Sequence, residues 1–346
     1  MSQFVYKKKR SNSLSDIVLN NHSHKCDLHV DKVDLHVDKV DLHIDEGYGR
    51  GSKKIMKVLK EIKTYTEDRP IKFTIGSEIL VIGVADGHGG SYFYSVLASG
   101  SFQLYFLKNY YDTNKNIEES LLKTFDDINI LANKYKYTKR PGGTTLNCCV
   151  IDKKYDKAYI ANLGDSVTNI FRKIDGNYTS VFRSVDHDAE SLIEQERIKN
   201  KYYRTTFTKI CEATYLKCYG IETMVTGAIG NFDFPVGLQR KIPDISCIDI
   251  QKDDVIIVSS DGYYEKYSTV YSILGPGRDE SQIPRDLIIL EEKFGLVNCN
   301  ISKKLFDLHI EKNAKLYNGD KEDNLEEIIN NIKTICDNNT IITHIV

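Results

Sequence analysis

Short apolar runs separated by polar turns follow the chain from about residue 48 onward. Runs of four to eight residues rich in Val, Ile and Tyr are typical of strands, and apolar residues spaced three and four apart indicate amphipathic helices. Because strands and helical pairs do not alternate as regular βαβ units, we expect an α+β fold. The pattern predicts strands over Glu78–Ala85, Thr144–Ile151, Ala158–Asn162, Val167–Arg172, Tyr178–Ser184, Asp254–Ser259 and Thr340–Val346, and helices over Ser91–Tyr111, Ile117–Tyr135, Ser191–Lys199 and Leu325–Ile335.

Residues 27–47 hold three tandem heptapeptides, DLHVDKV, DLHVDKV and DLHIDEG. Their apolar alternation slips by one residue at each junction, so a single strand would not keep one apolar face. The interleaved His and Asp residues are able to bind a transition metal, but biased repeats rarely form packed sites. We therefore expect a flexible N-terminal extension over residues 1–47, followed by a folded domain over residues 48–346.

The charge balance argues against a nucleic-acid partner. The 346 residues include 47 Lys and Arg against 49 Asp and Glu, a formal net charge of -2, with no global basic excess. At 41% hydrophobic and 28% charged residues, the composition is that of a folded globular protein. No apolar run is long enough to cross a bilayer, and no apolar segment follows the basic start in the way a secretory signal requires. We expect a protein without membrane association, and a monomer.

The cysteines indicate a reducing compartment. None of the eight forms a C-x-x-C pair, and the adjacent Cys148 and Cys149 would point to opposite faces of a strand. We expect free, buried thiols and a cytoplasmic location. The basic stretch Lys7–Arg10 leaves a nuclear location open.

Carboxylates stand at the ends of three predicted strands. Asp86 and Asp261 each directly follow an apolar strand, and Asp337 stands just before the last one. A single Asp-Gly pair is usually only a turn, but three acids at strand ends concentrate negative charge that a cation would neutralise. Mg²⁺ and Mn²⁺ prefer such oxygen ligands, and paired ions of this kind support hydrolysis of phosphate esters.

The residues that follow Asp86 suit this chemistry. Gly87 allows a tight turn and lets its backbone carbonyl join a metal shell. His88 stands beside that position, where a near-neutral pKa would let it protonate a leaving alkoxide.

Seven segments, in order, resemble the metal-dependent protein serine/threonine phosphatases of type 2C. The similarity extends over about residues 67 to 346, and the ordered series is far more specific than DGHGG alone. The segments are VIGVADGHGG (81–90), GGTTLNCCVID (142–152), YIANLGDS (159–166), VDHDAESLIEQERI (185–198), MVTGAIGNFDF (224–234), DDVIIVSSDG (253–262) and DNNTIITHIV (337–346).

The resemblance implies a four-layer sandwich, two antiparallel β-sheets flanked by α-helices, with a site for two Mg²⁺ or Mn²⁺ ions at one edge and a weaker third. It implies hydrolysis of phosphoserine and phosphothreonine in proteins by a water that bridges the two ions, with phosphoproteins as substrates and His88 as general acid. Asp86 would bridge the ions, and the implied metal ligands are Glu67, Asp86, Gly87, Asp165, Asp261, Glu265 and Asp337.

The sequence departs from the family pattern at several positions. The phosphate-binding Arg falls on Lys63, whose ammonium group cannot form the bidentate contact of a guanidinium, and Arg50 is a rival for that role. The usual Arg and Asp of the MVTGAIGNFDF segment are Gly227 and Asn231, which we expect to affect packing and the substrate flap. The segment Gly275–Asn300 is interpreted as a surface insertion, with a substrate or partner loop as the alternative.

Other mechanisms are disfavoured by missing motifs. No Cys directly follows a His, as a cysteine phosphatase would require, and no phosphate-binding loop of the G-x-x-x-x-G-K-[ST] type occurs. The remaining alternative is a catalytically weak or inactive phosphatase fold that acts as a binding or scaffolding protein. Retention of the strand-end Asp residues favours the enzyme.

Overall fold

The computed structural model describes most of the chain from residue 67 onward. The predicted extension 1–47, the helix 325–335 and the residues Arg50, Lys63 and Asp337 lie outside the described residues. The described residues are 67–89, 92–137, 141–210, 213–263, 265–266, 277–278, 282–296, 301–305, 307–308 and 341–346.

Five antiparallel strands form the first sheet, in the order β1-β2-β5-β6-β13. The apolar run ILVIGVA of β2 is buried along its whole length because both faces of this sheet are covered. Val81 packs on one face and Ile82 on the other, and Cys148 and Cys149 separate in the same way, as predicted. The strands are β1 (Arg69–Ile75), β2 (Ile79–Ala85), β5 (Leu146–Asp152), β6 (Lys157–Leu163) and β13 (Asp244–Asp249).

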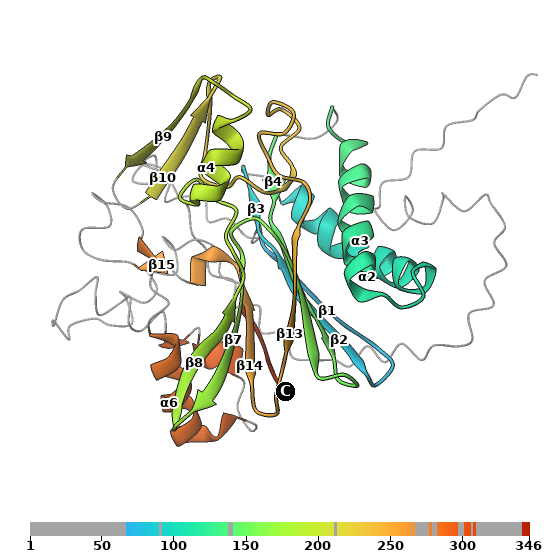
Figure 1. The fold of residues 1–346 in the computed structure, drawn as a ribbon, viewed down its shortest axis with the longest axis vertical. Helices are drawn as coiled ribbons and strands as arrows, with labels where there is room; N and C mark the ends of the chain where they lie inside the picture. The colour runs from blue at the N-terminus through green and yellow to red at the C-terminus, as the bar shows by residue number, and fades with distance from the viewer. Residues whose placement is uncertain are drawn as a thin grey trace, which may run out of the picture. The chain divides into compact units, whose positions relative to one another are not determined.

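Helices α2 (Phe93–Asp112) and α3 (Ile117–Asn133) cover one face of this sheet (Figure 1). The Asn116 side chain caps α3 by accepting a hydrogen bond from the N–H of Glu119 at 3.1 Å. Phe102, Phe106 and Phe125 are fully buried between the helices and the sheet. The aromatic and aliphatic spacing that predicted two helices is therefore the spacing of their core faces.

A second antiparallel sheet packs against the other face, and its strand order is β17-β14-β7-β8. Ile256 and Val258 of β14 face the first sheet across a shared apolar cluster, while Val255 and Ile257 point the other way. The strands are β7 (Val167–Ile174), β8 (Asn177–Arg183), β14 (Val255–Ser259) and β17 (Ile341–Ile345).

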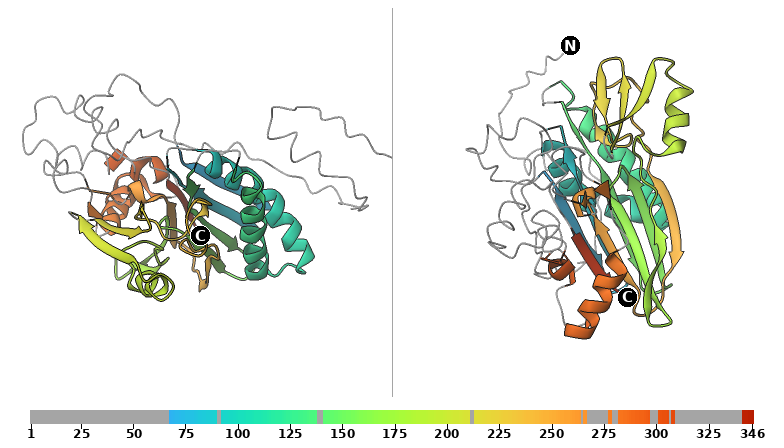
Figure 2. Two further views of the ribbon diagram at one scale, coloured as in Figure 1. Left: turned by 90° about the horizontal axis from the view of Figure 1, so that it is seen from above. Right: turned by 90° about the vertical axis from the view of Figure 1, so that its left-hand side faces the viewer.

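Helix α6 (Ile283–Phe294) covers the outer face of the second sheet and completes four layers, which the view from above in Figure 2 (left) displays. Its residues Leu287 and Leu290 are buried against that sheet. The interpretation of Gly275–Asn300 as a surface insertion is therefore wrong for residues 283–294. The four-layer α+β sandwich is confirmed.

A smaller unit lies beside the two sheets. The short helix α4 (Leu192–Lys199) packs with a three-stranded sheet through Ile198, Leu216 and Leu238. Hydrophobic periodicity did not predict these strands, which are rich in Thr and Lys. They are β9 (Thr205–Ile210), β10 (Ala213–Cys218) and β11 (Ile221–Thr223).

Short pairings complete the fold. The strands β3 (Gly87–His88), β4 (Gly143–Thr144) and β12 (Ile229–Gly230) form a small sheet, β15 (Glu265–Lys266) pairs with β16 (Gly277–Arg278), and a 3₁₀ turn, η2, spans Asp261–Tyr263.

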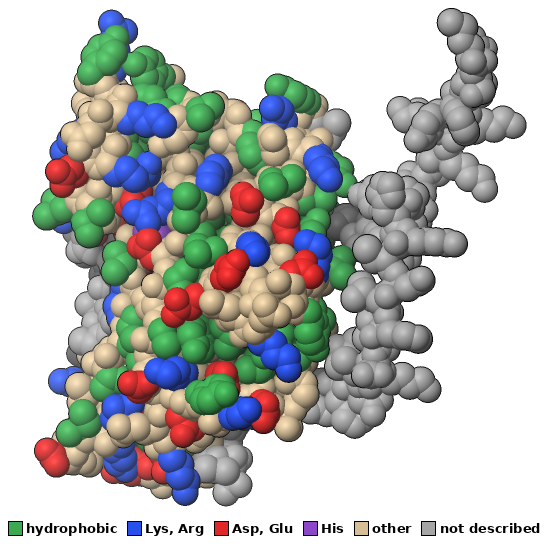
Figure 3. Space-filling model, turned by 45° about the vertical axis from the view of Figure 1, so that its right-hand side comes forward, with side chains coloured by type: hydrophobic (Ala, Val, Ile, Leu, Met, Phe, Trp, Pro, Cys, Tyr) green, Lys and Arg blue, Asp and Glu red, His purple; other side chains and the backbone are tan. Residues whose placement is uncertain are grey.

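On the face shown in Figure 3, Lys and Arg side chains are interspersed with Asp and Glu. None of the described helices is long and apolar enough to cross a membrane. Among the described cysteines, Cys148, Cys149, Cys218 and Cys247 are free thiols.

Candidate functional site at the sheet edge

The first acidic part of the candidate site forms where β1 begins and β2 ends. The antiparallel register pairs Arg69 with Ala85, and two further steps along both strands reach Glu67 and Gly87. A Cβ atom on Gly87 would lie 2.7 Å from the carbonyl oxygen of Glu67 and 3.0 Å from Ser95 Oγ, so only glycine permits this approach. The Ser95 hydroxyl also donates to the Glu67 carbonyl. The strand-end glycine of DGHGG is therefore held directly against the residue that sequence comparison selected as a ligand.

The second acidic part forms at one end of the other sheet. The register pairs Val167 of β7 with Ser259 of β14, and two further steps reach Asp165 and Asp261. Asp165 precedes its strand, whereas Asp261 follows its strand and opens η2. Because the strands are antiparallel, both carboxylates lie at the same end of the sheet.

Thr145 links the two acidic parts. Its Oγ1 accepts a hydrogen bond from the N–H of Asp86 at 3.1 Å and lies 2.7 Å from Ser166 Oγ. The Thr145 N–H also donates to the Asp86 carbonyl at 2.8 Å, and the Thr144 hydroxyl donates to the same carbonyl at 2.9 Å. Since Ser166 directly follows Asp165, the end of β2 and the start of β7 are fixed to each other. The acids of both sheets therefore share one edge.

His88 lies at this edge in contact with Asn231. The Nδ2 atom of Asn231 lies 2.9 Å from His88 Nε2, an amide donor facing a ring nitrogen. Burial lowers the pKa of His88 to about 4, with a further lowering from the Lys241 charge. The near-neutral pKa expected from the sequence is therefore not found. A Cβ atom on Gly143 would lie 2.9 Å from His88 Nε2, so glycine at 143 leaves room for the ring.

The structure places most predicted site residues at this edge. It thereby brings together residues that are far apart in the sequence, namely Glu67, Asp86, Gly87, His88, Asp165 and Asp261. The positions that lie outside the described part of the chain are Arg50, Lys63, Asp337 and the side chain of Glu265.

The donors at the edge are of the kind that hard divalent cations take. Carboxylates of Asp and Glu and a backbone carbonyl are the ligands of Mg²⁺ and Mn²⁺. Within the described residues, no group of three or more His, Cys, Asp or Glu stands arranged to hold a metal ion. One acid of the predicted set, Asp337, is not among those residues. The donor chemistry fits a divalent cation, and ligation by these residues stays a prediction.

An open hollow of about 670 Å³ lies along the segment that joins β8 to α4. Ser184 in its wall accepts a hydrogen bond from the N–H of Thr168 at 3.0 Å, which connects the hollow to the start of β7. Its lining residues are Arg183, Ser184, Val185, Asp186, Asp188, Glu190 and Ser191.

Sequence reasoning missed the residues that hold the acids in place. Thr145 and Ser166 lie in the segments GGTT and GDS. The order of these segments along the chain supports the family resemblance, but that resemblance assigns no role to their hydroxyl groups. Both side chains are buried, so their mutual contact replaces the water that hydroxyl groups otherwise bind. The sequence signal that could have identified Ser166 is its position directly after the strand-end acid Asp165.

The profile of the protein phosphatase 2C family matches residues 72–273. The chain belongs to the protein phosphatase 2C family. The matched range includes Asp86, Asp165 and Asp261, the three acids that the structure gathers from different strands. No curated protein matches the sequence.

Solved structures of other proteins share the fold. A serine-threonine phosphatase 2C from Toxoplasma gondii is 13% identical, with a TM-score of 0.59, and the match covers 81% of this chain and 90% of that one. A C. elegans sex determining protein is 18% identical, with a TM-score of 0.54, and the match covers 81% of this chain. This chain spans 61% of the length of the C. elegans structure. At these identities the likeness concerns the fold.

Proposed function

We propose that this phosphatase 2C-family chain is a metal-dependent phosphatase that hydrolyses phosphoserine and phosphothreonine in proteins. The observation that carries the proposal is the hydrogen-bonded link Asp86–Thr145–Ser166, which holds acids from both sheets at one edge. Family membership supports the same reaction. Phosphoproteins are the substrates that the family name implies.

Glu67, Asp86, the Gly87 carbonyl, Asp165 and Asp261 are the described groups that would hold divalent cations, with Glu265 and Asp337 added from the sequence. Bound Mg²⁺ or Mn²⁺ would supply positive charge for a phosphoryl group and a nucleophilic water at neutral pH. The chain's own contacts hold these donor groups in position. The Glu67–Gly87 contact and the Thr145 link keep the donors in place before any ion binds.

His88 would act next to the leaving oxygen. With a pKa near 4 its ring is neutral at pH 7, so it contributes through a ring N–H or a ring nitrogen rather than as an imidazolium. Asn231 would set which nitrogen is free, because its amide lies against Nε2. Lys63 remains the predicted phosphate-binding residue, with Arg50 as the rival.

Hydrolysis of p-nitrophenyl phosphate and of a phosphothreonine peptide tests the proposal. Purified full-length protein should turn over both substrates with Mn²⁺ and lose activity when EDTA removes the ion. Asp86→Asn and Asp261→Asn should each lower kcat/KM by at least about 100-fold, since direct ligands matter more than their outer partners. The matched control is Asp175→Asn in the β7–β8 turn, an Asp at φ 50°, which asparagine also tolerates.

Two results would contradict the proposal. Full activity of Asp86→Asn would remove the metal-site assignment. Binding of Mn²⁺ by the wild type without turnover of either substrate would favour the binding or scaffolding protein instead.

A further inference from the structure

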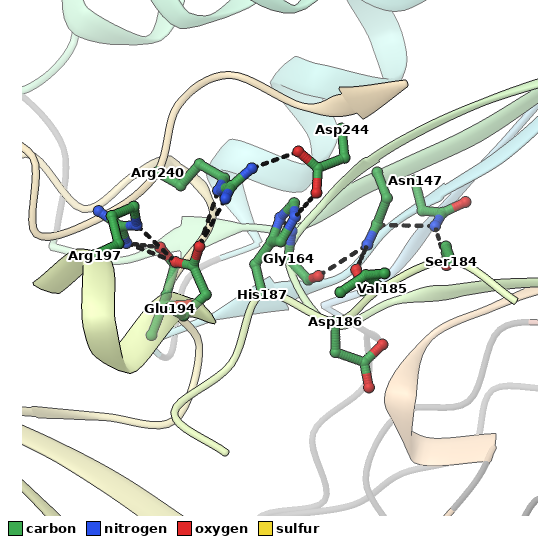
Figure 4. Close-up of polar contacts among 12 residues, drawn as sticks. Asn147, Gly164, Ser184, Val185, Asp186, His187, Glu194, Arg197, Arg240 and Asp244 are labelled. Carbon is green, nitrogen blue, oxygen red and sulfur yellow. Dashed lines mark hydrogen bonds and ion pairs between the residues drawn. The ribbon is translucent and has the colours of Figure 1, made fainter. Parts of the chain in front are cut away.

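His187 is buried between the candidate site and the smaller unit, with 1% of its surface exposed. Its Nδ1 accepts a hydrogen bond from the Gly164 N–H at 3.2 Å, and its Nε2 lies 3.0 Å from Asp244 Oδ2 (Figure 4). Because one nitrogen faces a donor and the other a carboxylate, the partners select the tautomer with its proton on Nε2. Both ring nitrogens are therefore engaged.

Gly164 is the residue directly before Asp165, and its backbone has a conformation that favours glycine, at φ +117°. A Cβ atom here would lie 2.6 Å from Thr145 Cβ. His187 holds both sides of this residue, because its own N–H donates to the Gly164 carbonyl at 2.9 Å while its ring accepts from the Gly164 N–H. The turn that presents Asp165 is thus held by one residue of a different segment.

Asp244 on β13 connects this ring to the buried Glu194 and to two partly exposed arginines. Arg240 contacts Asp244 and also donates to Glu194 Oε1 at 3.0 Å, and Arg197 donates to the other oxygen of Glu194. The hydrogen bond with His187 lowers the pKa of Asp244. Burial alone would raise the pKa of Glu194, but Arg197 and Arg240 outweigh it and the pKa is lowered. The chain of contacts therefore runs from helix α4 to the Asp165 turn.

Gly227 stands where the family usually has Arg. Because glycine has no side chain, His187 can occupy the space beside it. A Cβ atom at this position would lie 2.9 Å from His187 Cβ and 3.0 Å from its Nδ1. The departure from the family pattern thus coincides with the close packing of His187. A parallel backbone bridge joins Gly227 to Arg240, whose guanidinium contacts Glu194 and Asp244.

We propose that His187 is a positioning residue of the phosphatase site, which holds the Gly164–Asp165 turn at the acidic edge while Asp244 fixes its ring. This inference rests on the proposed function and deepens it. The role is exerted through the backbone of Gly164, and the ring itself touches no reacting atom. It follows that contact with Gly164 matters more to the site than contact with Asp244.

Two substitutions in the full chain separate the two contacts. In His187→Asn the side-chain oxygen can take the place of Nδ1 and accept from Gly164. In His187→Gln the longer amide can take the place of Nε2 and donate to Asp244. The measurements are Mn²⁺ affinity by calorimetry, hydrogen exchange of the Gly164 amide by NMR, and kcat and KM for p-nitrophenyl phosphate.

We expect His187→Gln to weaken Mn²⁺ binding by about tenfold or more, the range seen when partners of metal ligands are removed. Exchange of the Gly164 amide should become faster, and kcat should fall with little change in KM. His187→Asn should stay within about threefold of the wild type in all of these. A core variant in α3, Ile128→Val, controls for lost stability and should leave Mn²⁺ affinity and Gly164 exchange unchanged.

Equal effects of the Gln and Asn variants, or effects no larger than those of Ile128→Val, would overturn the inference. If the His187 variants show the expected changes in Mn²⁺ affinity and amide exchange but the wild type does not hydrolyse phosphate, the positioning role is upheld and the proposed function is rejected. If the wild type hydrolyses phosphate but the His187 variants bind Mn²⁺ normally, the proposed function is upheld and the positioning role is rejected.

Discussion

Individual residues at the candidate site are placed by close backbone contacts. Gly87 and Gly143 carry no side chain because carbonyl oxygens and the His88 ring occupy that space. Asn231, expected to affect packing and the substrate flap, contacts His88 directly. A family aspartate at this position would place a negative charge beside the ring, and the amide here does not. The departures in this chain therefore alter the surroundings of the general acid candidate.

His344 on β17 makes stability depend on pH. Burial, aided by the charges of Lys153 and Lys72, lowers its pKa from 6.5 to about 4. Between these values the unfolded chain binds more protons than the folded one, so the contribution of His344 is complete above about pH 6.5 and is lost as pH falls toward 4. The wild type should lose more free energy of unfolding between pH 7 and pH 5 than His344→Gln, measured by urea denaturation. Equal losses in both proteins would contradict this role.

The sequence pattern predicted the strands whose two faces are both apolar and the helices that have one regular apolar face. The strands β2, β5, β6, β7 and β14 and the helices α2 and α3 lie within a few residues of their expected ranges. The edge strands β1 and β13 were missed. β1 contains Pro70 and a Lys, which an edge strand tolerates because one of its sides has no paired neighbour. Periodicity detects burial, and the residues of β1 and β13 are buried too sparsely to show it.

Helix α6 should contribute to stability through its buried face. Leu287 is fully buried against the second sheet, so Leu287→Ala should lower the free energy of unfolding by about 2–5 kcal/mol. Arg285→Ala, at an exposed position of the same helix, should change it by no more than about 0.5 kcal/mol. Urea denaturation followed by circular dichroism measures both. A negligible effect of Leu287→Ala would restore the interpretation as a surface insertion.

For the whole molecule, the near balance of 47 basic and 49 acidic residues conceals their placement. Opposite charges are interspersed on the face of Figure 3, whereas acids from both sheets gather at one edge. Carboxylates held close together repel one another, and a bound cation relieves this repulsion. The folded state should therefore be more stable with divalent ions than without them.

Thermal unfolding with and without Mn²⁺ tests this expectation. An ion that binds only the folded state, at 100 times its dissociation constant, adds about 2.7 kcal/mol of stability. The melting temperature of the wild type should rise with Mn²⁺, and that of Asp86→Asn should rise much less. Asp175→Asn again serves as the control and should respond like the wild type. An equal rise in all three proteins would place the ion elsewhere.

The sequence by itself determined the family resemblance, the core strands and helices and the strand-end acids, because local periodicity and ordered motifs are properties of neighbouring residues. Tertiary structure alone decided that Glu67 lies against Gly87, that Thr145 joins Asp86 to Ser166, and that His187 holds Gly164. These contacts join residues 20 to 59 positions apart. They depend on the register of antiparallel strands and on the packing of one sheet upon the other, which no local pattern of residues encodes.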